Sequence, residues 1–225
     1  MRIKWFGHSA FQVEIDGKTF LVDPWLTNPV SPVKGEPSVD ADYILVTHDH
    51  GDHLGDAVTI MKRSGKAKAV AIFEIANYIA EALGDSSRVI DANIGGPIDL
   101  GEGLYAVLTP AFHSSMRGHP TGVVFGKEGK MVYHAGDTGL MYDMKLIGEL
   151  YTPVVAMLPI GGHYTMGPKE AAKAAELINP EYAIPMHYGT FPVIRGTPEE
   201  FKEWLSKFAP HVKPIILKPG EETTI

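Results

Sequence analysis

Alternating apolar and polar residues open the chain and predict short β-strands. Ile3–Phe6, Phe11–Ile15 and Thr19–Val22 are rich in β-branched and aromatic side chains, and Phe11–Ile15 alternates strictly. Asp16-Gly17 separates the second run from the third, and this dipeptide is typical of a two-residue hairpin turn. After a proline-rich loop, the uninterrupted apolar run Tyr43–Thr47 predicts a strand that is buried on both faces.

The rest of the chain predicts alternating strands and helices. Apolar residues recur at helical spacing in Leu54–Ser64, Glu74–Leu83, Leu140–Leu150, Gly167–Leu177 and Pro198–Phe208. Strands are expected at Lys68–Phe73, Leu104–Leu108, Gly122–Phe125, Met131–His134, Val154–Leu158, Tyr182–Pro185 and Pro214–Leu217. Hairpins followed by strand–helix units occur twice, which predicts an α+β fold. We expect two mixed sheets face to face with helices on both outer faces, an αββα four-layer sandwich of two similar halves. No linker interrupts the chain, so we expect one domain over residues 1–225.

Composition narrows the classes of function. The chain has 225 residues, of which 44% are hydrophobic, enough to bury a core. Lys plus Arg number 20 and Asp plus Glu 27, giving a net charge of −7 with no basic run, which argues against nucleic acid as a passively bound partner. No apolar stretch is long enough to span a bilayer and no signal-peptide core is present, so we expect a cytoplasmic chain without a membrane partner. Ten histidines and no cysteine mean that any metal is held by His, Asp or Glu.

The densest chemistry lies in the segment 47–53, Thr-His-Asp-His-Gly-Asp-His, where a buried strand ends and a helix begins. Residues two apart in an extended segment point the same way, so His48 and His50 can reach one metal ion. Asp52 and His53 follow the glycine turn and can face a second point. For Asp52 alone, the alternative is a helix cap. Three imidazoles and a carboxylate at the carboxyl end of a strand predict a metal site.

The pattern His-x-His-x-Asp-His after an apolar strand resembles the metallo-β-lactamase superfamily. Three later motifs extend the resemblance along the chain: an isolated His113, Asp137 after another strand, and His187 after a late strand. The resemblance implies one metal ion held by His48, His50 and His113, a second held by Asp52, His53 and His187, and Asp137 as the bridge between them.

This resemblance implies metal-assisted hydrolysis. Two divalent cations about 3.5–4 Å apart can share a hydroxide and clamp the attacking and leaving oxygens. Zn²⁺ suits a His and carboxylate set best, with Mn, Fe, Ni or Co left open. Asp52 and Asp137 would then serve catalysis as carboxylates of the metal site. We expect a small ester, lactone or phosphodiester as substrate. A phosphodiesterase or nuclease acting on RNA or nucleotides stays open, as do a non-catalytic metal-binding or regulatory protein and a homo-oligomer.

The segment Trp5–Ser9, together with the motifs around the other candidate ligands, resembles one branch of that superfamily, short metal-dependent hydrolases related to L-ascorbate-6-phosphate lactonase. The resemblance implies that His8 lies near the metals. There it can orient substrate or donate a proton to the leaving group, or it can hydrogen-bond to a ligand carboxylate. His134 is expected to be buried support for the turn that carries Asp137.

Three further residues are candidates for contact with substrate. His163 follows a strand and precedes a helix, where an imidazole can be a general acid, a phosphate contact or a polar lining residue. Arg117 and Arg195 each follow a candidate ligand in sequence and can bind a phosphate or carboxylate in a bidentate way. For both, the alternative is an ordinary exposed surface arginine.

Overall fold

The computed structural model describes residues 1–37 and 39–225 and divides the chain into two units. Unit 1 comprises Met1–Gly96, Ser114–Pro120 and Leu217–Ile225, and unit 2 comprises Pro97–His113 and Thr121–Ile216. Each unit is built on one mixed sheet of seven strands.

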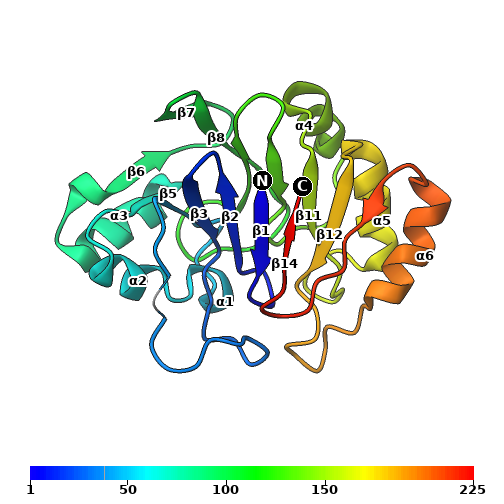
Figure 1. The fold of residues 1–225 in the computed structure, drawn as a ribbon, viewed down its shortest axis with the longest axis horizontal. Helices are drawn as coiled ribbons and strands as arrows, with labels where there is room; N and C mark the ends of the chain where they lie inside the picture. The colour runs from blue at the N-terminus through cyan, green and yellow to red at the C-terminus, as the bar shows by residue number, and fades with distance from the viewer. Residues whose placement is uncertain (38) are drawn as a thin grey trace. The chain divides into compact units, whose positions relative to one another are not determined.

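The first sheet starts from the hairpin that the sequence predicts. Strands β1 (Arg2–Trp5), β2 (Phe11–Ile15) and β3 (Lys18–Val22) run antiparallel. Asp16 and Gly17 both have positive φ, 49° and 83°, as a two-residue turn between twisted strands requires. A strand that the sequence does not predict, β14 (Glu222–Thr224), pairs with β1. It brings the two chain ends together (Figure 1), and the Met1 amino group donates to the Ile225 carbonyl over 2.7 Å.

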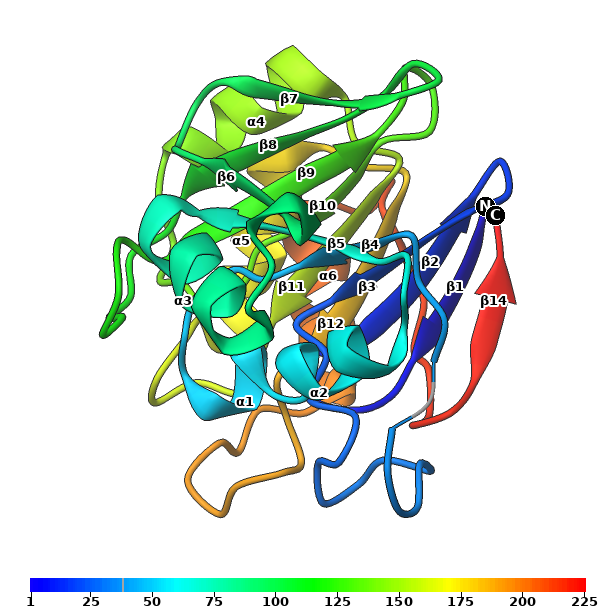
Figure 2. The same ribbon diagram turned by 90° about the vertical axis from the view of Figure 1, so that its left-hand side faces the viewer.

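The second part of this sheet is parallel. β4 (Tyr43–Leu45), β5 (Lys68–Ile72) and β6 (Val89–Ala92) complete the order β14-β1-β2-β3-β4-β5-β6. The connections carry α1 (Gly51–Leu54), α2 (Ala57–Arg63), α3 (Phe73–Leu83) and a 3₁₀ turn (Ser86–Arg88). Helix α3 packs against β5 and β6, with α2 at its side (Figure 2).

The helix predicted over residues 54–64 is wrong at its beginning. Gly55 separates α1 from α2, with a φ of 47°. A Cβ at this position would lie 2.7 Å from the Cα of Trp25, so only glycine allows the two chain segments to approach this closely. The break leaves α1 as a single turn that holds Asp52 and His53.

The sheet of unit 2 repeats the same plan. Its strands lie in the order β13-β12-β11-β10-β9-β8-β7, in which β7 to β10 pair antiparallel and β10 to β13 pair parallel. They are β7 (Pro97–Gly101), β8 (Leu104–Pro110), β9 (Thr121–Gly126), β10 (Val132–His134), β11 (Val155–Pro159), β12 (Tyr182–Met186) and β13 (Lys213–Pro214). The predicted strand 214–217 is wrong beyond Pro214, and β6 and β7 were not predicted because both are partly exposed and lack a continuous apolar run.

Helices α4 (Asp143–Tyr151), α5 (Pro168–Ile178) and α6 (Pro198–Phe208) bury the core of unit 2. Thr197 caps the start of α6, and its hydroxyl accepts a hydrogen bond from the Glu200 amide over 3.3 Å. The buried face of α5 is largely alanine, which lets its neighbours approach closely. Among the described residues, no helix has both the length and the apolar character needed to cross a bilayer.

The two sheets therefore share one pattern of antiparallel and parallel pairs, in which β1, β3 and β4 of unit 1 correspond to β8, β10 and β11 of unit 2. The edge strands differ in chain order, because β14 follows the other strands of its sheet and β7 precedes those of its sheet. Candidate site residues follow corresponding strands. His8 lies three residues after β1 ends, and His113 lies three residues after β8 ends. Asp23 follows β3, and Asp137 follows β10. The predicted similarity of the two halves is confirmed in their pattern of strand pairing, whereas the single domain stays a prediction.

Candidate metal centre

The loop after β4 brings two imidazoles of unit 1 together. His48 Nε2 and His50 Nδ1 lie 3.0 Å apart, as expected for residues two apart in an extended segment. The other ring nitrogen of His48, Nδ1, lies 3.1 Å from the Thr47 hydroxyl. His48 is buried and His50 is partly exposed. The pair therefore presents two nitrogens to one point from a rigid backbone.

Helix α1 adds a carboxylate and a third imidazole. Asp52 is not a helix cap: His50 occupies the cap position, and no side chain caps the helix there. Instead, Asp52 Oδ2 lies 2.9 Å from His8 Nε2 and 3.8 Å from His53 Nε2. The potential ligand atoms of these three residues lie within 4.8 Å of one another. Of the two roles considered for His8, the hydrogen bond to a candidate ligand carboxylate matches this geometry.

Sequence reasoning missed Asp23, the first residue after β3. Its carboxylate is buried and accepts hydrogen bonds from the Thr47 amide (2.8 Å) and the Thr47 hydroxyl (2.7 Å). Asp23 Oδ2 also lies 2.7 Å from His53 Nδ1. A carboxylate on Nδ1 orients the ring and turns Nε2 toward Asp52. The available signal was an aspartate directly after a buried strand.

Unit 2 carries the three remaining candidate ligands at the ends of β8, β10 and β12. Asp137 Oδ2 lies 3.0 Å from His187 Nε2 and 3.5 Å from His113 Nε2. Asp137 and His187 are buried, and the side chain of His113 is 10% exposed. The Gly136 amide donates to Nδ1 of buried His134 over 3.1 Å, so His134 supports the turn before Asp137 as expected.

The candidates for substrate contact in unit 2 are exposed. His163 has a positive φ of 64°, and its ring lies edge-on to Tyr164 with the centroids 4.5 Å apart. Arg195 donates from Nε to the Pro192 carbonyl over 3.4 Å. Burial, with a smaller effect from Glu199, raises the pKa of Tyr188 to about 12. The Tyr188 phenol is therefore protonated at neutral pH and is not a base there.

Arg117 lies in unit 1 and binds a carboxylate of the same unit. Its Nη1 donates to Asp49 Oδ2 over 2.9 Å, and Asp49 lies between the two histidines of the β4 loop. Burial on its own raises the pKa of Asp49. The hydrogen bonds from the Met116 amide, the Ser115 hydroxyl and Arg117, with the charge of Arg117, outweigh that effect and hold the pKa below its usual value.

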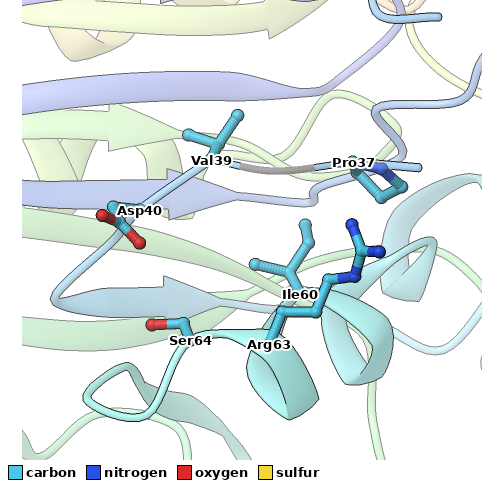
Figure 3. A pocket seen from close by; sticks show the side chains of 6 residues that line it. All are labelled: Pro37, Val39, Asp40, Ile60, Arg63 and Ser64. Carbon is cyan, nitrogen blue, oxygen red and sulfur yellow. The ribbon is translucent and has the colours of Figure 1, made fainter. Parts of the chain in front are cut away.

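A separate pocket of unit 1 lies between α2 and the loop residues Pro37, Val39 and Asp40 (Figure 3). Ile60 and Arg63 come from α2, while Asp40 comes from the loop. Arg63 also forms an ion pair with Glu36. The described lining contains no histidine, so this pocket lacks the ligands that the candidate metal centre offers.

The candidate metal-binding atoms of both units are thus imidazole nitrogens and carboxylate oxygens. This set fits a borderline divalent cation such as Zn²⁺ and does not need the thiolates that the chain lacks. The unit 1 set is largely buried and is held by hydrogen bonds within the chain, such as those of His53 to Asp23 and of His8 to Asp52, as expected for residues that bind a metal. In unit 2, Asp137 and His187 are buried.

Comparisons with known proteins identify the family. The model of the Beta-lactamase superfamily domain matches residues 18–188. This chain belongs to the metallo-β-lactamase superfamily. Within it, the chain is 54% identical over 223 residues to a UPF0173 metal-dependent hydrolase from Hyperthermus butylicus, covering 97% of each chain. It is 57% identical over 229 residues to another from Staphylothermus marinus, covering 99% of this chain and 98% of that one. The protein is therefore a UPF0173 metal-dependent hydrolase.

The similarity to known proteins extends from the sequence to the three-dimensional structure. Igni18, a metallo hydrolase from the hyperthermophilic archaeon Ignicoccus hospitalis, is 48% identical and superposes with a TM-score of 0.92, covering 99% of this chain and 97% of its own. This likeness confirms the predicted αββα metallo-β-lactamase fold. The expected reaction class, metal-dependent hydrolysis, is confirmed at the level of the family.

Proposed function

We propose that this UPF0173 hydrolase uses two divalent metal ions, with Zn²⁺ as the native metal. The observation that carries the proposal is the position of Asp137 Oδ2, one oxygen within 3.5 Å of imidazole nitrogens from two different strand ends. The superfamily resemblance assigns His113 and His187 to different ions. A carboxylate that approaches both histidines is suited to bridge those ions.

The superfamily resemblance implies the ligands of each ion: His48, His50 and His113 for one, and Asp52, His53 and His187 for the other. Ions bound there would lower the pKa of water and polarise the scissile bond. Other residues of the chain orient these ligands. Asp23 orients the His53 ring through Nδ1, and His8 orients the carboxylate of Asp52.

We propose that a residue other than His8 donates the proton to the leaving group. His8 is buried and hydrogen-bonded to Asp52, which suits positioning and not contact with a leaving group. His163 is exposed, so its imidazole is accessible to substrate. We assign the general-acid role to His163.

The proposed substrate is a small ester, lactone or phosphodiester. The net charge of −7 and the lack of a basic run favour a small molecule over RNA, because RNA binding depends on cationic contacts to phosphates. A homo-oligomer stays a prediction of the sequence.

The test is an ion count by elemental analysis on protein purified without added metal. It is combined with assays of bis-p-nitrophenyl phosphate, a model lactone and an RNA oligonucleotide. We expect about two ions per chain and turnover of one of the two small substrates. Asp137→Ala should lower metal content and turnover together, whereas Asp143→Ala, an exposed aspartate in the first turn of α4, should change neither. Normal turnover in Asp137→Ala would refute the two-metal proposal.

A further inference from the structure

The segment that directly follows His113 forms a strap on unit 1. This strap, Ser114–Pro120, groups with unit 1 although the residues on both sides of it belong to unit 2. It contains no helix or strand. A Cβ at Gly118 would lie 2.5 Å from Glu74 Oε2 and 2.9 Å from Ile72 Cγ2. The strap therefore rests closely against the end of β5 and the start of α3.

Three donors of the strap converge on a single carboxylate, that of Asp49. The Ser115 hydroxyl and the Met116 amide donate to Asp49 Oδ1 over 2.9 and 2.8 Å. Arg117 Nη1 donates to Oδ2 over 2.9 Å. The side chain of Asp49 has no exposed surface, so its charge is balanced within the protein by Arg117. Both carboxylate oxygens have strap donors.

Arg117 also contacts an aromatic ring. Its Cζ lies 4.1 Å from the ring centroid of Tyr78 on α3, a cation–π contact. A guanidinium held between a carboxylate and an aromatic ring has little freedom to reorient. Only Nη1 of the guanidinium donates to Asp49, and the Arg117 side chain is 42% exposed, so the substrate-binding role considered from the sequence stays a prediction beside this contact.

The position of Asp49 connects this clamp to the metal ligands. Asp49 lies between His48 and His50, and successive side chains of an extended segment point to opposite sides. Fixing the Asp49 side chain on one side therefore fixes the direction of both imidazoles on the other. The 3.0 Å separation of His48 Nε2 and His50 Nδ1 shows that the two rings converge.

We propose that Arg117 is a positioning residue for the metal centre, which acts through Asp49 to hold His48 and His50 in a metal-binding geometry. Arg117 is 69 residues from His48 in the chain. The proposal rests on metal binding at this loop and does not depend on which substrate is hydrolysed.

Zinc affinity tests the proposal directly. Wild type, Arg117→Ala and Arg117→Lys are titrated with Zn²⁺ in competition with a chromophoric chelator. We expect about tenfold weaker zinc binding in Arg117→Ala, the scale typical of losing a partner of a metal ligand. Arg117→Lys should lose less, since an ammonium keeps the charge and one donor. Arg2→Ala is the matched control because Arg2 pairs with Glu14 in the same unit, away from the ligands, and it should leave zinc affinity unchanged.

Two further readouts separate positioning from other roles. The urea midpoint of the metal-free protein is measured for each variant, and so are kcat and KM for whichever substrate is hydrolysed. Positioning predicts weaker zinc binding and a lower kcat with KM within twofold of wild type. Unchanged zinc affinity with a raised KM would assign Arg117 to substrate binding. Unchanged zinc affinity with a lowered midpoint would make the clamp merely structural, and either result overturns the proposal.

The role of Arg117 can still be tested if Arg117→Ala does not fold. Arg117→Gln keeps the length of the stem and one amide donor while removing the charge, and the same zinc titration applies to it and to Arg117→Lys. Because zinc affinity is measured without turnover, failure of the proposed hydrolytic substrates leaves this result interpretable.

Discussion

Replacing Asp23 with alanine removes one acceptor group that serves three buried contacts. The Thr47 amide, the Thr47 hydroxyl and His53 Nδ1 all lie within 2.8 Å of its carboxylate oxygens. A buried donor left without an acceptor costs about 1–3 kcal/mol, so three of them give about 3 kcal/mol even at the low end. Typical domains are stable by only about 5–15 kcal/mol, so the expected loss is a large share of the total.

The same change should weaken metal binding. The contact from Asp23 to Nδ1 selects the ring orientation that turns His53 Nε2 toward Asp52, 3.8 Å away. Without it the ring can rotate and exchange tautomers, and losing such a partner typically costs about 10–100-fold in metal affinity. Asp23→Asn keeps one carbonyl oxygen and should fall between wild type and Asp23→Ala on both measurements.

Two assays measure these effects separately. Urea unfolding of the chelator-treated protein gives the free energy of unfolding without metal, and zinc competition gives the affinity. Asp42→Ala is the control: the Asp42 carboxylate accepts one backbone hydrogen bond, from the Thr19 amide over 2.8 Å, and pairs with exposed Lys66, and neither partner is a candidate ligand. It should lose about 1 kcal/mol of stability and no zinc affinity. Wild-type zinc affinity in Asp23→Ala, or an equal loss in Asp42→Ala, would refute the reasoning.

Two further predictions concern stability in unit 2. Thr197→Ala removes the capping hydroxyl of α6 and should lower the free energy of unfolding by about 1 kcal/mol in urea, with turnover unchanged; a wild-type value would mean that the cap contributes nothing. Gly148→Ala places a Cβ 2.2 Å from the Ile178 carbonyl oxygen and should cost about 1–3 kcal/mol, whereas Gly65→Ala, with no atom within 4 Å, should be near neutral; equal effects would contradict the close approach of α4 and α5.

The local sequence pattern was sufficient to predict the elements whose structure depends on neighbouring residues. Strict alternation located β2 to the residue, and Asp16-Gly17 located its turn, because both depend on neighbours a few residues away. The apolar run before His48 placed the ligand loop at the end of a buried strand. Strands that depend on distant partners were less predictable. The polar β14 forms a strand because β1 offers it an open edge, and a gap of more than 200 residues hides that pairing from local reasoning.

The candidate ligands could be found from the sequence because metal chemistry restricts residue type and spacing. His48, His50, Asp52 and His53 form one motif, and the family resemblance supplied His113, Asp137 and His187. The residues that we propose to orient these candidate ligands left no comparable signal. Asp23 reaches His53 across 30 residues, and Arg117 reaches Asp49 across 68.

The sequence by itself therefore determined the class of fold, the candidate donor residues and the reaction class, since periodicity and ligand chemistry are properties of the chain. Only the tertiary structure decided which carboxylate holds which imidazole, and which arginine balances the charge of buried Asp49. The physical reason is that a buried charge or donor must be satisfied by whichever partner folding brings within about 3 Å. That partner is set by the packing of strands and loops, and not by proximity along the chain.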